Sequence, residues 1–363
     1  MILGYLHTAV AFAIVLGVLV SVHEYGHYIA ARRCGVVVEV FSIGFGPALF
    51  QHRDRHGTLW KVAAIPLGGF VKMKGWVDFG SLPEGDVESG SFRGRPLGSR
   101  ALIVAAGPIA NMILAFVLFT SLVAAIGIAT VEPVVSRVLP NTPAAAAGLK
   151  SGDRIVIIDG KSIRSFEAIR GIVQKSDGQK LSVVIEDRNG LHHVILIPRV
   201  TVVDGKRIGE IGIVGADVSH RPVSFAAALF YGADQTWRVT GATVAGLWQL
   251  VTGHESVRHL GGPVRIAELS GQAASLGVAE FVSFIAILSV NLGLLNLVPI
   301  PVLDGGHLLF CAFEAVARRP LPRTVQEIGL VVGAALLASL VLFVTWNELG
   351  IPSPIHIISG LKP

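Results

Sequence analysis

Two histidines and a glutamate stand at a spacing that suits a bound metal ion. They are His23, Glu24 and His27, in the run His-Glu-Tyr-Gly-His. On a helix, residues four apart share one face, so both imidazoles can bind one metal while Glu24 reaches a water on that metal. The chemistry that this set supports is metal-assisted hydrolysis, with the carboxylate as the base.

A third ligand is expected, because a hydrolytic zinc usually has three protein ligands and one open position. We predict Asp304, in the run Leu-Asp-Gly-Gly-His that ends at His307. His23 lies roughly 25 Å along the first apolar stretch if that stretch is a helix, and Asp304 lies about as far along the third one. His307 is a rival ligand, although a role in packing or in orienting a ligand is favoured for it.

The composition is that of a membrane protein. Of 363 residues, 52% are hydrophobic and 15% are charged, whereas soluble chains carry about 25% charged residues. Four apolar stretches are long enough to cross a bilayer, at residues 5–31, 101–128, 281–303 and 328–346. We therefore predict a polytopic α-helical membrane protein with about four transmembrane helices. His and Glu side chains inside such a helix are costly unless they are functional.

The end of the third stretch is interrupted by Asn296, Pro299 and Pro301. Helix-breaking residues free backbone groups that lipid cannot satisfy, so this segment must be buried in protein or line a wet cavity. Asp304 therefore follows an irregular segment near the inner end of that stretch.

Charge and cysteine content exclude two other classes of protein. The net charge is +5, with no run of Lys or Arg, so no nucleic-acid partner is indicated. The chain has two cysteines, Cys34 and Cys311. A disulfide scaffold is thereby excluded, and both residues are predicted to be free thiols on the reducing side of the membrane.

The basic residues predict the orientation in the membrane. Residues 31–100 hold ten Lys and Arg, and the turn after the third stretch adds three more, whereas the carboxy-terminal tail has only Lys362. Because positively charged loops stay in the cytoplasm, both termini and the segment 129–280 are predicted to be outside. The residues that carry chemistry then lie near the cytoplasmic face.

Four segments follow from these patterns. Residues 1–128 form the first half of a membrane core, with a cytoplasmic hairpin loop at 31–100, and residues 281–363 form the second half. Residues 129–215 alternate short β-type runs with turn signals, which indicates an inserted β-rich domain. Residues 216–280 are interpreted as amphipathic connecting helices. Their aromatic residues either lie in the outer leaflet or pack on the β-rich domain or on the spans.

Several runs occur together in this chain. The His-Glu motif in a first span is paired with Asn-x-x-Pro-x-Pro-x-Leu-Asp-Gly at 296–305, and further runs are Phe-Ser-Ile-Gly-Phe-Gly-Pro at 41–47, Ile-Pro-Leu-Gly-Gly-Phe-Val-Lys-Met at 65–73 and Gly-Pro-Ile-Ala-Asn at 107–111. This combination resembles the site-2 protease family of intramembrane zinc metalloproteases. The likeness is greatest to the bacterial RseP type, the regulator of sigma-E protease. Members of that type carry two PDZ domains in tandem, whereas the segment here has room for one.

The resemblance implies a zinc endopeptidase with one Zn²⁺ per chain, bound by His23, His27 and Asp304. Glu24 is then the base that activates the water and passes a proton to the leaving amine. Asn111 and Asn296 are implied to hydrogen-bond the substrate backbone or the developing oxyanion. Both amides can equally serve as polar contacts between helices.

The implied substrates are single-span membrane proteins in a lipid bilayer. They are either an anti-sigma factor already trimmed by an outer protease or remnant signal peptides, cut during regulated intramembrane proteolysis. The implied location is the bacterial inner membrane.

The run from Trp60 to Met73 alternates apolar and polar residues around Gly68-Gly69. This pattern predicts a β-hairpin that dips toward the membrane. In the family such an element adds a strand to the substrate, here through the run Gly68, Gly69, Phe70 and Val71. Strand addition unwinds a transmembrane helix while satisfying its backbone. An ordinary cytoplasmic hairpin is the alternative.

The run Asn-Thr-Pro-Ala-Ala-Ala-Ala-Gly-Leu-Lys-Ser-Gly-Asp-Arg-Ile at 141–155 resembles the signature of a PDZ domain of the bacterial protease kind. Backbone N–H groups around Gly148 and Leu149 are expected to capture a peptide carboxylate. The alternative is that the domain binds no peptide and limits access to the membrane site by size.

Two rival interpretations stand beside this one. The first is a membrane protease of another lineage with the same His-Glu motif, such as a prenyl-protein processing enzyme, and the run Leu-Asp-Gly argues against it. The second is a non-catalytic PDZ membrane scaffold. The intact set of His23, Glu24, His27 and Asp304 argues against a scaffold, which has no need of these residues.

Overall fold

The computed structural model describes residues 2–76, 89–176, 178–203, 206–216, 218–254, 261–319 and 321–348. The chain divides into two compact units. Residues 1–122 and 229–363 form the first, called the membrane unit here, and residues 123–228 form the second, called the β domain. The β domain thus extends beyond the predicted bounds 129–215. The tail with Lys362, used above for orientation, lies outside the described residues.

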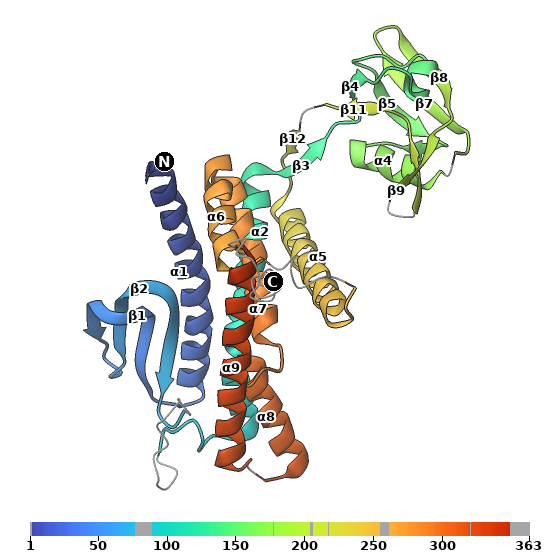
Figure 1. The fold of residues 1–363 in the computed structure, drawn as a ribbon. Coiled ribbons are helices and arrows are strands. Elements are labelled where there is room, and N and C mark those ends of the chain that lie inside the picture. Colours follow the sequence, from blue (N-terminus) through green and yellow to red (C-terminus); the bar gives the residue numbers. More distant parts are fainter. Residues whose placement is uncertain are drawn as a thin grey trace, which may run out of the picture. The chain divides into compact units, whose positions relative to one another are not determined.

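Four helices of the described chain are long and apolar enough to cross a bilayer. They are α1 (Ile2–Arg33), α2 (Leu97–Ile126), α7 (Val278–Asn296) and α9 (Arg323–Glu348). At 1.5 Å per residue, even the 19-residue α7 covers nearly the whole hydrocarbon core of about 30 Å. Figure 1 shows α1, α7 and α9 running in the same general direction. The predicted fold class, a polytopic membrane protein with an inserted β-rich domain, is confirmed.

Helices α1, α2 and α7 share one apolar core. Val15 and Leu19 of α1 are buried with Ile285 of α7, and Leu114 and Leu118 of α2 pack against them. Helix α6 (Pro263–Leu276) joins α7 directly and also contacts α1. This core holds α1 firmly over the two turns that precede His23.

The chain after α7 is irregular, as the sequence indicates. Helix α7 ends at Asn296, and residues 297–303 lead to a separate helix, α8 (Asp304–Ala317). Asp304 is therefore the first residue of a helix. The far half of α8 is tied to α2, because Nη2 of Arg100 lies 2.5 Å from Oε2 of Glu314, a carboxylate that is 8% exposed.

Helix α5 (Phe225–Val251) packs on the membrane helices from Leu229 onward. Gly232 lies against Thr120 of α2, and Oγ1 of Thr243 donates a hydrogen bond of 2.6 Å to Oδ1 of Asn291 on α7. Of the placements that the sequence allows, the structure has α5 packed on the spans. Its aromatic side chains, such as Trp237 and Trp248, point outward.

Strands β1 (Val38–Arg53) and β2 (Leu59–Met73) form a long antiparallel hairpin that folds back on itself. The segment 40–43 of β1 pairs on one side with residues 59–62 and on the other with residues 69–72. The hairpin is thus a small sheet of four segments, in the order 48–53, 59–63, 40–43 and 69–73. Among the described residues no further strand pairs with 69–73, so this segment is an edge (Figure 1).

The position of the hairpin turn corrects one prediction. Residues 54–58 make the turn, and Gly68-Gly69 lie inside β2. The glycines are needed for close approach: a Cβ on Gly69 would lie 2.7 Å from the carbonyl oxygen of Ser42 and 2.9 Å from Cγ1 of Val20 on α1. A glycine pair commonly marks a turn, whereas here it allows β2 to approach α1 closely.

The β domain is built from short strands and two helices. Its elements are β3 (Ile128–Val131), β4 (Val135–Val138), α3 (Pro143–Ala146), β5 (Arg154–Ile158), β6 (Lys161–Ser162), α4 (Phe166–Lys175), β7 (Leu181–Asp187), β8 (Gly190–Leu196), β9 (Arg199–Val203), β10 (Lys206–Glu210), β11 (Ile213–Gly215) and β12 (Val218–Arg221). The largest sheet has the strand order β6-β5-β7-β8. Its core contains Ile155, Ile158, Ile169, Val183 and Leu196.

Candidate metal centre

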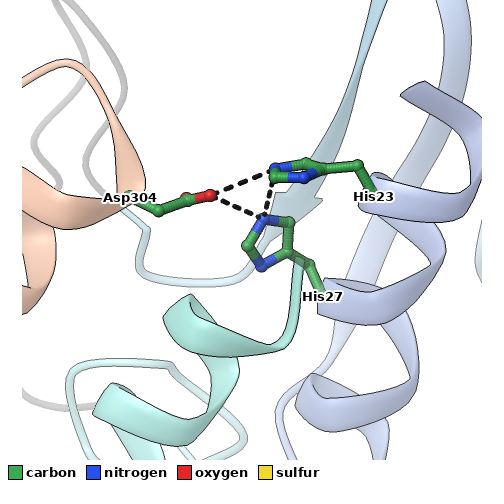
Figure 2. A group of neighbouring side chains, drawn as sticks. All are labelled: His23, His27 and Asp304. Carbon is green, nitrogen blue, oxygen red and sulfur yellow. Dashed lines mark hydrogen bonds and ion pairs between the residues drawn. The ribbon is translucent and has the colours of Figure 1, made fainter. Parts of the chain in front are cut away.

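Helix α1 brings two imidazoles to one point. His23 and His27 are one helical turn apart, and the two residues are 8% and 7% exposed. Their Nε2 atoms lie 3.2 Å from each other, and Figure 2 shows both rings directed toward Asp304. The predicted spacing of the motif therefore places both rings on one face of the helix.

Asp304 reaches the same point from α8. Its Oδ2 atom lies 3.1 Å from Nε2 of His23 and 3.5 Å from Nε2 of His27 (Figure 2). All candidate ligand atoms of the three residues lie within 4.8 Å of one another. Two motifs that are far apart in the sequence thus meet, as the sequence predicted.

The three residues fit a tetrahedral zinc ion. Ligand atoms about 2.0–2.1 Å from such an ion lie roughly 3.3 Å apart, and the observed separations are 3.1, 3.2 and 3.5 Å. Oδ2 of Asp304 is buried beside these two imidazole nitrogens and, among the described residues, makes no hydrogen bond of good geometry. A buried carboxylate oxygen in this state is costly unless a cation satisfies it. Two imidazoles and one carboxylate are also a donor set of hydrolytic zinc sites.

Both imidazoles are oriented from behind by α2. Nδ1 of His27 lies 2.8 Å from the carbonyl oxygen of Ile103, so Nδ1 donates its proton there and Nε2 is free for a metal. Nδ2 of the Asn111 amide lies 3.3 Å from Nδ1 of His23. The nitrogen and oxygen of an amide exchange places by a half-turn rotation of the group, and with the oxygen turned to the ring Asn111 would accept the Nδ1 proton and leave Nε2 of His23 free for a metal.

The structure places Asn111, a predicted substrate contact, behind the ring of His23. The side chain is completely buried and is absent from the walls of the cavity described below. Oγ of Ser289 on α7 donates to its backbone oxygen at 2.8 Å. Asn111 therefore orients a candidate ligand and joins two spans, and the sequence could not separate this role from substrate contact because a buried amide suits both.

Sequence reasoning missed Gly107 of α2, which lies beside the two imidazoles. A Cβ at this position would lie 2.8 Å from Nε2 of His23 and closer still to Nε2 of His27. Only a glycine leaves room for the rings and an ion at this crossing. The run Gly-Pro-Ile-Ala-Asn was noted, but a residue without a side chain gave no chemical signal.

A cavity of about 550 Å³ adjoins the three candidate ligands. Glu24 lines it next to His23, and Asn296 lines it from the end of α7. Residues 68–73 of β2, which include the edge segment of the hairpin, also line it. The cavity therefore combines the predicted base, the predicted ligands and a strand edge that no other described strand pairs with.

His307 also lines this cavity, one turn after Asp304 on α8. It is not part of the group of three whose ligand atoms converge. Its ring packs against Trp76, with ring centroids 4.9 Å apart. The structure therefore favours packing over metal binding for His307.

The β domain has a cavity of its own, of about 510 Å³, between α4 and residues 208–215. Gly148 and Leu149 are not among the residues that line it. Their N–H groups donate to the carbonyl oxygens of Ala145 and Ala144, each at 3.1 Å, and Leu149 is 5% exposed in the core. Both N–H groups that were expected to capture a carboxylate are thus already bonded within the domain.

Comparison with known proteins agrees with this geometry. Residues 11–340 match Peptidase family M50. A protein of Rhizobium meliloti that is named as a zinc metalloprotease is 41% identical over 361 residues, covering 94% of this chain and 96% of that protein. Metalloprotease MmpA of Caulobacter vibrioides is 36% identical over 396 residues, covering 99% of each chain.

The regulator of sigma-E protease RseP of Escherichia coli is 32% identical over 448 aligned positions, covering 95% of this chain and 99% of that protein. The alignment is longer than the 363 residues of this chain, so that relative has additional residues. Among solved structures, the PDZ domain of an SdrC-like protein from Listeria innocua is 26% identical, with a TM-score of 0.21, covering 25% of this chain and 99% of that domain. The chain belongs to Peptidase family M50, the family of site-2 type zinc metalloproteases.

Proposed function

We propose that this metalloprotease holds one zinc ion through His23, His27 and Asp304 and cleaves transmembrane segments of single-span membrane proteins. The observation that carries the proposal is one cavity that contains the three converging ligand atoms, Glu24 and a free strand edge. A scaffold protein needs none of these features together. The candidate ligand atoms from α1 and α8 lie at the distances from one another that a shared zinc ion requires. This supports a metal-dependent reaction rather than a structural contact.

The groups that line the cavity have different roles in this reaction. Zinc, when bound, supplies Lewis-acid activation of a water molecule and of the scissile carbonyl. Glu24 takes the proton of the attacking water and passes it to the leaving amine. Asn296 donates a hydrogen bond to the substrate backbone or to the developing oxyanion.

The edge segment 69–73 of β2 binds the substrate as an added strand. A transmembrane helix has its scissile carbonyls locked in hydrogen bonds, and strand addition opens the helix while giving its backbone new partners. The edge lies beside the base, since a Cβ on Gly69 would lie 3.3 Å from Cγ of Glu24. An extended substrate on this edge is therefore held across the candidate metal centre.

The β domain filters substrates, and its cavity between α4 and residues 208–215 holds a peptide end. The cavity is lined by apolar residues such as Leu139, Ile169 and Val214, which suit an apolar carboxy-terminal residue. Val214→Asp should reduce cleavage of a trimmed substrate, and Leu191→Asp, on the exposed face of β8, should not. Equal cleavage by both variants would leave the domain as a passive size filter.

The substrates fitting this arrangement are an anti-sigma factor already cut outside the membrane, or remnant signal peptides, in the inner membrane of a bacterium. The β domain and the amino terminus are external in this proposal. A variant without Cys34 and Cys311 tests the orientation in intact cells. A cysteine at Ser89 should resist an impermeant thiol reagent and a cysteine at Leu191 should react, and the opposite pattern would invert the orientation.

The protease assignment is tested with purified protein in lipid nanodiscs and a model transmembrane peptide. Wild-type protein should contain one zinc per chain and cut the peptide. Glu24→Gln should keep the zinc and lose cleavage by a factor of about 100 or more, because the amide removes the base and not a ligand. Cleavage by Glu24→Gln at the wild-type rate would refute the role of Glu24.

A further inference from the structure

The turn of the β1–β2 hairpin is bonded to α1 immediately beyond the candidate metal ligands. Oδ2 of Asp54 lies 3.3 Å from the hydroxyl of Tyr28, the residue after His27. The same oxygen accepts from Nε1 of Trp60 on β2 at 3.0 Å. One carboxylate oxygen therefore joins the helix that carries the candidate ligands to the sheet that carries the substrate edge.

The other carboxylate oxygen of Asp54 closes the turn itself. Oδ1 accepts from the backbone N–H groups of His56 and Thr58 at 2.8 and 3.0 Å. Oγ1 of the buried Thr58 then donates to the carbonyl oxygen of Val38 at 2.9 Å. The turn is thus fixed at both ends and has little freedom to move against α1.

Aromatic packing strengthens the same connection between α1 and the hairpin. The ring of Trp60 lies 5.1 Å from that of Tyr28 and 4.4 Å from that of Phe41, centroid to centroid. Phe41 is 2% exposed and pairs with both Trp60 and Val71 in the sheet. A displacement of the turn is therefore transmitted through a single middle segment, residues 40–43, to the edge segment 69–73.

We propose that Tyr28, Asp54 and Trp60 are positioning residues that set the substrate-binding edge of β2 in register with the metal centre. The proposal rests on the proposed strand addition of substrate to this edge. None of the three residues lines the cavity, so each acts through the hairpin. Tyr28 and His27 are consecutive on α1. The same rigid helical turn therefore fixes the position of the metal and, through the hairpin, the position of the bound substrate strand.

The first test measures the hairpin itself, without any reaction. Hydrogen exchange of the full-length zinc-loaded protein in nanodiscs reports on the amides of residues 59–73. Tyr28→Phe and Asp54→Ala should raise their exchange rates by roughly 10-fold or more, since each removes a hydrogen bond to a charged group. Unchanged exchange in both variants would overturn the proposal, whatever the enzyme does.

Tyr25→Phe is the matched control. Tyr25 lies on the same helix and stacks on Tyr28, with ring centroids 5.9 Å apart, but it is half exposed and no hydrogen bond of its hydroxyl is present among the described residues. The variant removes an equal hydroxyl without touching the turn. Its hairpin exchange should match that of the wild type.

The second test separates positioning from general destabilisation. Tyr28→Phe should raise KM for a transmembrane peptide by roughly 10-fold, leave kcat within a factor of about two, and keep one zinc per chain. Asp54→Asn, which retains one acceptor, should lie between Asp54→Ala and wild type. Loss of zinc, or a fall in kcat at constant KM, would overturn the positioning role.

The two levels of inference fail in different ways. If wild-type protein does not cut the peptide, the proposed function fails, and the hydrogen-exchange comparison still decides whether Tyr28, Asp54 and Trp60 hold the hairpin. If wild-type protein cuts the peptide and Tyr28→Phe has the same KM and exchange rates as the wild type, the positioning role fails and the protease assignment stands.

Discussion

Replacement of Gly107 by alanine should empty the metal centre while leaving the fold in place. The added Cβ would lie 2.8 Å from Nε2 of His23, whereas carbon and nitrogen atoms settle at about 3.5 Å. The ring must therefore retreat by about 0.7 Å, and the ring of His27, which is closer, must move further. Zinc sites hold their ligand distances to within about 0.2 Å. We expect the zinc affinity to fall by roughly 100-fold. This is the upper end of the loss of metal affinity that follows mutation of residues in contact with metal ligands.

The assay is zinc content after dialysis against a competing chelator, with thermal unfolding as the check on folding. Alanine is a better helix former than glycine by about 1 kcal/mol, so the helix itself is not weakened. Gly98→Ala is the matched control, because nothing lies within 4 Å of a Cβ at that position on the same helix. Gly107→Ala with wild-type zinc content and activity would refute the assignment of this crossing as the metal centre.

Three further outcomes are expected. Asp304→Ala should lose zinc, because two imidazoles alone make an incomplete site; unchanged metal content and activity would redirect attention to His307. Arg100→Ala should destabilise the protein in detergent by about 3 kcal/mol, since it leaves the buried Glu314 carboxylate unpaired. The control is Arg238→Ala, which breaks an exposed ion pair and should destabilise the protein by less than about 1 kcal/mol. The Trp60 indole N–H, with the backbone N–H groups of Thr58 and His56, lowers the pKa of Asp54 from 3.8 to about 2. A carboxyl group whose pKa is lower in the folded protein than in the unfolded chain stabilises the fold. This stabilisation is complete at pH values above the pKa of the unfolded chain, and it is lost as the pH falls through the pKa of the folded protein. Hairpin protection, measured by hydrogen exchange corrected for intrinsic rates, should therefore stay constant at neutral pH and fall only below about pH 4, and a loss near pH 6 would contradict this.

The sequence predicts most of the membrane unit because its signals are local. Apolar stretches of sufficient length identify the spans, and the four-residue spacing of His23 and His27 fixes their common face. Depth along two helices predicts that Asp304 lies near His23, and its Oδ2 atom lies 3.1 Å from Nε2 of that residue. The helix-breaking residues after Asn296 mark where regular helix ends.

The remaining features depend on packing between distant segments, which residue types do not encode. Gly107 matters through the space it leaves beside two rings on another helix. Gly69 resembles a turn residue, yet it serves a close contact with α1. Leu149 belongs to a loop whose N–H groups are already bonded within the β domain, and the cavity of that domain lies instead beside α4.

X-ray absorption at the zinc edge of the purified wild-type protein tests the central claim most directly. The structure predicts one zinc per chain with two imidazole ligands and oxygen donors, all at about 2.0–2.2 Å. His27→Ala, which like Asp304→Ala leaves only two ligands, should lose the zinc signal. A zinc ion bound by thiolate sulfur at about 2.3 Å, or wild-type protein that takes up no zinc at all, would contradict a catalytic centre formed by His23, His27 and Asp304.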